Sequence, residues 1–205
     1  ITLNSAAAAY SGSAADLVAA FAGTVTTHTG TVEITDALSV ANANTIDAAT
    51  SGVITASITD DATDLATLTG TGNAYTITLN NDDAATLAEL VTINAATTGA
   101  ITLNTSTIAA NYSGTAANLV LAFAGTVTTH TGTVTISDEP TVAQLVSINA
   151  ATTGAITLSD TDGALSGTAA NLVLAFAGTV TTHTGTVAIT DAPTLAQLVT
   201  INAET

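Results

Sequence analysis

Two patterns of hydrophobic and polar residues alternate along this chain. In the first, apolar and polar positions alternate over a few residues, as in Ile156-Thr157-Leu158, which is the period of two that a β-strand requires. In the second, apolar residues are dense and do not alternate. The stretch A-A-N-L-V-L-A-F-A over 169–177 is of this kind, and it predicts a buried helix that ends at Gly178. Short strands followed by short helices predict an α/β fold.

Polar residues mark the expected starts of some helices. Thr168 is followed three positions later by Asn171, and Ser13 is followed in the same way by Asp16. Both pairs are loose versions of the capping box, in which a side chain before the helix accepts a backbone N–H of its first turn. We therefore expect Ser13 and Thr168 to cap the helices that follow them.

A further strand and helix are predicted near the C-terminal end. Val187 and Ile189 alternate with threonines, and the segment P-T-L-A-Q-L-V-T-I-N-A over 193–203 follows. Asp191 is expected to cap this helix, with Pro193 in its first turn. The apolar residues expected on one face of the helix are Leu195, Leu198, Val199 and Ile201.

Most of the chain consists of internal repeats. One phrase, running from S-G-(S/T)-A-A-(D/N)-L-V through T-T-H-T-G-T-V to a final Asp, occurs at 11–36, 113–138 and 166–191. Aligning on I-T-L divides the chain into repeats 1–53, 54–100 (divergent), 101–155 and 156–205 (truncated). A strand and a helix in every ~25 residues predict one continuous α/β repeat solenoid, with short parallel strands on one face and short helices on the other. A right-handed parallel β-helix is the alternative, because Thr-rich segments such as T-V-T-T-H-T-G could add a strand.

The two ends of the chain match the repeat phrase. The chain ends in I-N-A-E-T, where other copies read I-N-A-A-T-T-G-A-I-T-L, and it begins with I-T-L. Repeats that lack polar capping units leave adhesive ends, and end-to-end contacts that do not close generate filaments. The sequence predicts either head-to-tail self-association or a segment of a longer repeat protein.

Composition narrows the choice of partners and location. The chain has no Lys or Arg and a formal net charge of −16, so it should repel nucleic acids and anionic lipids, whereas divalent cations remain possible partners. No apolar run approaches the roughly 20 residues of a membrane helix, so we expect no membrane insertion. Without Cys there are no disulfides or thiolate metal sites. The absence of tryptic sites suits an extracellular or cell-surface protein.

Two phrases carry a family resemblance. V-A-I-T-D-A-P-T-L-A-Q-L-V-T-I-N-A over 187–203 and S-G-T-A-A-N-L over 166–172 resemble tandem repeats of very large secreted bacterial surface proteins, which are often grouped with the hemolysin-type (RTX) calcium-binding proteins. The resemblance covers most of the chain and implies a bacterial extracellular role in adhesion, matrix or surface fibres. The tandem G-G-x-G-x-D calcium signature of that group is absent here, so calcium binding is not implied.

Aspartates recur where a strand should turn into a helix. Asp36, Asp138 and Asp191 share this position, with Asp83 expected there in the second repeat, and helix capping is their expected role. No cofactor is required by the sequence, and calcium is the candidate ion for the acidic residues. Calcium takes about six to eight oxygen ligands, and acidic residues cluster locally. The candidate metal ligands are Asp60, Asp61, Asp64, Asp82 and Asp83.

Three histidines share one position in T-T-H-T-G, namely His28, His130 and His183. A column of imidazoles could bind a transition metal. Against this, the second repeat has Asn73 nearest the equivalent place, and no Cys or nearby acid completes a site. A structural role is therefore the expected one, and aromatic positions of the repeat are likewise expected in the core: Tyr10, Tyr112, Phe21, Phe123 and Phe176.

The sequence as a whole predicts a structural repeat protein of an extracellular filament, surface layer or matrix, and not an enzyme. It contains no Ser-His-acid arrangement at recognisable spacing, no Cys or Lys nucleophile and no phosphate-binding glycine loop of the usual pattern. The alternatives are a calcium-dependent adhesin module and an ice-binding solenoid that presents ranks of threonines. The threonines expected on the outer face are Thr2, Thr102, Thr133, Thr135, Thr157, Thr186 and Thr190.

Overall fold

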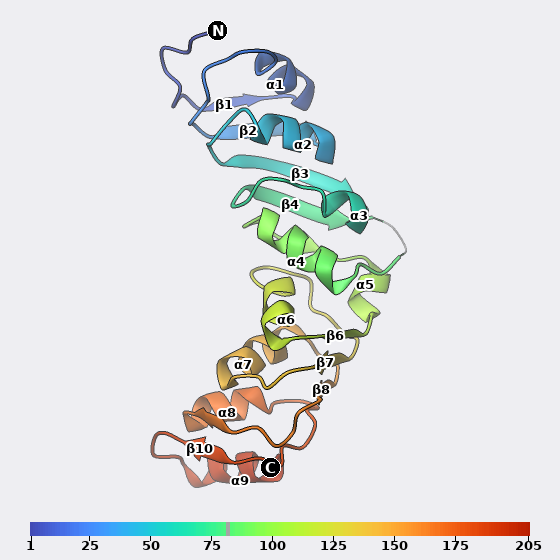
Figure 1. Ribbon diagram of the computed structural model, residues 1–205, viewed down its shortest axis with the longest axis vertical. Coiled ribbons are helices and arrows are strands. Elements are labelled where there is room, and N and C mark those ends of the chain that lie inside the picture. Colours follow the sequence, from blue (N-terminus) through green and yellow to red (C-terminus); the bar gives the residue numbers. More distant parts are fainter. Residues whose placement is uncertain (81–82) are drawn as a thin grey trace. The chain divides into compact units, whose positions relative to one another are not determined.

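Strands and helices alternate along the chain, except that β9 follows β8 with no helix between them, in a computed structural model that describes residues 1–80 and 83–205 (Figure 1). The strands are β1 (Tyr10–Gly12), β2 (Val32–Ala37), β3 (Ile54–Asp60), β4 (Ala74–Leu79), β5 (Ile101–Thr102), β6 (Tyr112–Gly114), β7 (Val134–Ile136), β8 (Ile156–Leu158), β9 (Leu165–Gly167) and β10 (Val187–Ile189). The helices are α1 (Ala14–Ala20), α2 (Val40–Asp47), α3 (Ala62–Leu65), α4 (Leu87–Ala96), α5 (Thr105–Ala109), α6 (Ala116–Ala122), α7 (Val142–Ala151), α8 (Ala169–Ala175) and α9 (Leu195–Ala203).

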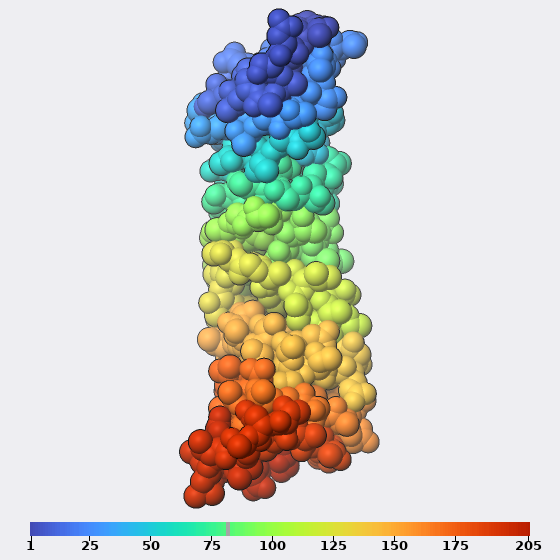
Figure 2. All heavy atoms as spheres, turned by 90° about the vertical axis from the view of Figure 1, so that its left-hand side faces the viewer, coloured from blue at the N-terminus to red at the C-terminus, as the bar shows by residue number. Residues whose placement is uncertain are grey.

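The chain forms two compact units. The first comprises Ile1–Ala85, Glu89–Asn104 and Gly125–Thr128, and the second comprises Thr86–Ala88, Thr105–Ala124 and Thr129–Thr205. The first unit holds one sheet in the order β1-β2-β3-β4-β5, and the second holds β6-β7-β8 and β9-β10. All of these strand pairs are parallel, which confirms the α/β class. Within each unit the colours of Figure 2 change in bands, because segments close in the sequence pack together.

Alternation along the strands separates the core from the surface, as expected for a half-buried strand. In β3, Ile54 and Ile58 are buried, while Thr55 and Thr59, which directly follow them, are exposed. The predicted core phenylalanines Phe21, Phe123 and Phe176 are buried as well. The outward threonines are exposed, apart from Thr135, which is half-buried. None of the helices in the described residues is long and apolar enough to cross a membrane.

The predicted helix starts at Ser13 and Thr168 are confirmed. The Ser13 hydroxyl accepts the Asp16 N–H at 3.1 Å, and the Thr168 hydroxyl accepts the Asn171 N–H at 3.3 Å. α8 follows Thr168 as expected, but it ends at Ala175, ahead of Gly178, which has a φ of +76°. Only glycine adopts such a φ without strain, so Gly178 lies in the turn after the helix.

The prediction for the last helix is wrong in two respects. α9 is capped by Thr194, whose hydroxyl accepts the Gln197 N–H at 3.2 Å, and not by Asp191. Pro193 therefore lies before the cap and outside the first turn. Thr194 is the cap in preference to Asp191 because the Gln197 side chain also accepts the Thr194 N–H, which completes a full capping box. Of the predicted apolar face, only Ile201 is buried.

Candidate functional site

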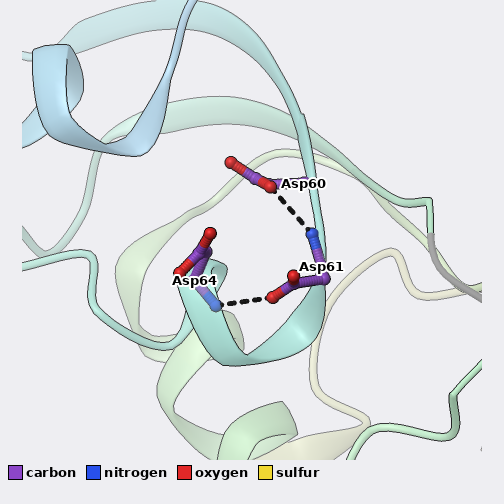
Figure 3. A group of neighbouring side chains, drawn as sticks. All are labelled: Asp60, Asp61 and Asp64. Atoms are coloured by element: carbon purple, nitrogen blue, oxygen red, sulfur yellow. Dashed lines mark hydrogen bonds between the residues drawn. The ribbon is translucent and has the colours of Figure 1, made fainter.

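Three of the five candidate metal ligands lie together where β3 ends and α3 begins (Figure 3). One carboxylate oxygen from each of Asp60, Asp61 and Asp64 lies within 4.8 Å of the others. Two of these groups already bind backbone. Asp60 Oδ1 accepts the Asp61 N–H at 3.1 Å, and Asp61 Oδ1 accepts the Asp64 N–H at 2.8 Å as the N-cap of α3.

The other two candidate ligands are Asp82 and Asp83. Asp82 lies outside the described residues. Asp83 is exposed, and its backbone carbonyl accepts the Asn104 side-chain amide at 3.1 Å. Among the residues that the structure describes, the acidic group is thus limited to three carboxylates, half of a calcium coordination shell, and Asp64 is exposed to water.

The recurring aspartates Asp36, Asp138 and Asp191 do cap helices, but not the helices predicted. Each accepts the N–H of the first residue of a helix that begins 22 residues earlier. The bonds are Ala14 N to Asp36 at 2.7 Å, Ala116 N to Asp138 at 2.7 Å and Ala169 N to Asp191 at 2.8 Å. Each carboxylate thereby satisfies a helix donor that has no partner within its own helix.

Parallel strand pairing explains this correction. β9 leads into α8, and β10 lies beside β9 in parallel. The end of β10 therefore lies beside the start of α8, and Asp191 meets Ala169 there. A pattern read along the chain associates Asp191 with the next helix. Its true partner becomes visible only once the strand pairing is known.

Two of the histidines are buried and hydrogen-bonded at both ring nitrogens. His28 Nδ1 lies 3.0 Å from Thr50 Oγ1, and its Nε2 lies 2.6 Å from the Ala8 carbonyl oxygen. His130 makes the same pair of contacts, with Thr152 and Ala110. Because a carbonyl oxygen can only accept, Nε2 carries a proton in both rings. Each threonine hydroxyl lies against Nδ1 and also donates to the backbone carbonyl of its histidine. Neither nitrogen is left for a metal.

The surroundings of these histidines are apolar. The Tyr10 ring stacks on His28 at a centroid distance of 4.7 Å, and Phe123 lies 5.3 Å from His130. Burial lowers the pKa of His130 below its usual range, although the contact with the Ala110 carbonyl opposes the shift. Isolated parallel β-bridges of the backbone pair His28 with Thr50, Asn73 with Thr97 and His130 with Thr152. Asn73 therefore occupies, in the second repeat, the position that His28 and His130 occupy in theirs.

His183 differs from the other two. It is 2% exposed, yet neither ring nitrogen has a hydrogen-bond partner among the described residues. Thr205 stands where Thr152 stands relative to His130, but its hydroxyl donates to the Ile201 carbonyl at 3.2 Å. A buried polar group left unbonded is destabilising. The T-T-H-T-G phrase is identical around the three histidines and therefore does not distinguish His183 from the other two.

Matched substitutions should separate these histidines. We expect His130→Phe to lower the free energy of unfolding by about 1–3 kcal/mol, because the Ala110 carbonyl loses the ring N–H that it accepts. His183→Phe should leave stability unchanged or raise it, because it removes an unbonded ring beside Phe176. Urea unfolding followed by circular dichroism measures both effects. Equal losses in the two variants would contradict the assignment.

The lowered pKa of His130 predicts that the stability of the fold depends on pH. Since the pKa of His130 is lowered in the folded protein, the unfolded chain binds this proton more readily. The stability contributed by neutral His130 is therefore complete above its unfolded pKa, about 6.5, and declines as the pH falls below that value. The gap in unfolding free energy between the wild type and His130→Phe should narrow over this range.

Comparison with known proteins identifies no relatives. No protein-family model, curated protein or solved structure matches the chain.

Proposed function

We propose that this chain is a structural repeat protein of an extracellular filament, surface layer or matrix. In this proposal it is an α/β solenoid that extends by end-to-end stacking of its repeats, with short parallel strands on one face and helices on the other. The observation that carries the proposal is the recurring bond from Asp36, Asp138 and Asp191 to a helix start 22 residues earlier. Such a bond ties each strand–helix unit to the one before it.

The packing of neighbouring elements supports the same proposal. β1 to β5 pair in sequence order, and in the second unit α7 packs on α8 and α8 on α9. When each unit contacts mainly its neighbours, stability accumulates along the stack and further units can be added without a change of design. Among the side chains most suited to catalysis, His28, His130 and the recurring aspartates Asp36, Asp138 and Asp191 serve in internal hydrogen bonds, which favours a structural role.

Charge limits how copies of this chain can associate and which partners they can bind. With a formal net charge of −16 and no Lys or Arg, lateral contacts between copies must use hydrogen bonds, apolar surface or bridging cations. Nucleic acids are disfavoured as partners for the same electrostatic reason.

Electron microscopy combined with sedimentation velocity tests this function. We expect filaments whose formation is favoured by added salt, because salt screens the repulsion between acidic copies. Trypsin should leave them intact, because the chain offers no Lys or Arg. A chain that remains monomeric at high protein concentration and high salt would overturn the proposal.

A second candidate is calcium-dependent adhesion, favoured by the oxygens of Asp60, Asp61 and Asp64 within 4.8 Å. Because water would have to complete the shell, we expect weak binding, with a dissociation constant on the order of 1 mM. Calorimetric titration with calcium, and the same titration of Asp64→Asn, measures it. Unchanged heats in the variant would exclude this group as the site.

A further inference from the structure

Two surfaces expose apolar residues whose counterparts elsewhere in the repeat are buried. On α9, Leu198 is 42% exposed, whereas its counterpart Leu145 on α7 is fully buried. At the other end of the chain, Ile1 is 79% exposed, whereas Ile156, the first residue of another I-T-L, is 3% exposed. We call residues 187–189 with α9 the C-terminal surface, and residues 1–3 with α1 the N-terminal surface.

One side of the Ile1–Leu3 segment is bonded as in the other copies. The Thr26 N–H donates to the Ile1 carbonyl at 3.0 Å, and the Leu3 N–H donates to Thr26 Oγ1 at 3.3 Å. Thr181 makes the same two contacts with Ile156 and Leu158, at 2.9 and 3.2 Å. The segment is therefore already held in the conformation of the repeat, and the side that β7 covers in residues 156–158 is open in residues 1–3.

The C-terminal surface has the matching open edge. β10 occupies the place in its repeat that β7 occupies in the preceding one. β7 pairs with β6 on one edge and β8 on the other, while β10 pairs with β9 alone. Beside the free edge lies a hollow lined by Val187, Ile189, Leu198, Ile201 and Asn202, among others.

An asparagine beside this edge, Asn202, corresponds to an asparagine that joins two helices elsewhere in the repeat. On α7, Asn149 donates to the carbonyls of Ala175 and Ala177 at 3.0 and 2.6 Å, which joins α7 to the end of α8. Its counterpart Asn202 lines the hollow, and within the described part of the chain no carbonyl accepts from its side chain. The residues of the first copy that correspond to Ala175 and Ala177 are Ala20 and Ala22, and both are exposed.

We propose that the C-terminal surface binds the N-terminal surface of a second copy of this chain in the register used between β7 and β8. The pairs are Val187 with Ile1, Ala188 with Thr2 and Ile189 with Leu3, by analogy with Val134 and Ile156, Thr135 and Thr157, and Ile136 and Leu158. α1 of the second copy packs on α9, and Asn202 donates to the carbonyls of its Ala20 and Ala22. This docking rests on the proposed function and specifies its surface and register.

Cysteine cross-linking tests the register, because the natural chain has no Cys. Chains carrying Thr2→Cys and Ala188→Cys are prepared separately, mixed and oxidised. Paired parallel strands place these Cα atoms within disulfide range, about 4.4–6.8 Å, so a heterodimer should form. Thr2→Cys mixed with Thr190→Cys is two residues out of register and should cross-link at least about tenfold less. Equal yields from the two mixtures would overturn the register.

A matched pair of charge substitutions tests the surface. Leu198→Asp should raise the concentration for half-assembly at least about tenfold, because docking would bury an unpaired carboxylate. Leu174→Asp alters an exposed leucine on α8 outside both surfaces and should leave assembly unchanged. Sedimentation velocity reports assembly, and circular dichroism reports folding. Polymers that form equally well from Leu198→Asp would overturn this docking alone, whereas a wild-type chain that stays monomeric overturns the filament function as well.

Discussion

Replacing Gly154 with alanine is expected to destabilise the second unit severely, lowering the free energy of unfolding by about 3 kcal/mol or more. A Cβ at Gly154 would overlap the backbone carbonyl oxygen of Gly132. This neighbour is backbone and cannot rotate away, as a flexible side chain could. The Gly132 N–H is itself bonded to the Ile108 carbonyl at 3.2 Å, so relief would require several hydrogen-bonded segments to separate. Urea unfolding followed by far-ultraviolet circular dichroism measures the loss.

Gly163→Ala provides the control for this substitution. The atoms that its Cβ would meet belong to the Glu139 side chain, which can change rotamer at little cost. We expect a loss below about 1 kcal/mol. If Gly154→Ala were tolerated as well as Gly163→Ala, the close backbone approach between Gly132 and Gly154 would be wrong.

Leu145→Ala is expected to cost about 2–5 kcal/mol, whereas the same change at Leu198 should cost less than about 1 kcal/mol. The two leucines hold the same place in A-Q-L-V-(S/T)-I-N-A, but Leu145 is fully buried on α7 and Leu198 is partly exposed on α9. Removing Leu145 leaves a cavity, while removing Leu198 opens only surface. Denaturation of dilute, monomeric protein measures both. Similar losses would mean that α9 is covered in the monomer.

Local elements could be predicted from the sequence where the cause is local. The alternation of Ile156-Thr157-Leu158 predicted β8, and the hydroxyls of Ser13 and Thr168 predicted helix starts, because a strand period and an N-cap depend on residues within one turn or so of each other. The cap of α9 is Thr194 and not the predicted Asp191, because Gln197 three positions later completes a capping box with Thr194.

Long-range partners could not be predicted in this way. The helix that Asp191 caps lies 22 residues back, and that link depends on β10 lying parallel to β9. The metal candidates show the same limit. Asp60, Asp61 and Asp64 form a group because they are neighbours in sequence, whereas the position of Asp83, from a separate predicted pair, depends on the fold of another segment.

The direction of the aspartate bonds makes the two ends of the chain unequal in how they tolerate loss. If the last strand and helix detach, Asp191 leaves with them, and the Ala169 N–H at the start of α8 loses its acceptor. If the first strand and helix detach instead, Asp36 keeps its carboxylate in water, where a lone charge is well solvated. Fraying from the C-terminal end therefore removes the acceptor that caps the helix left behind, whereas fraying from the N-terminal end removes no such acceptor. The capping bonds thus give local unfolding a direction along the chain.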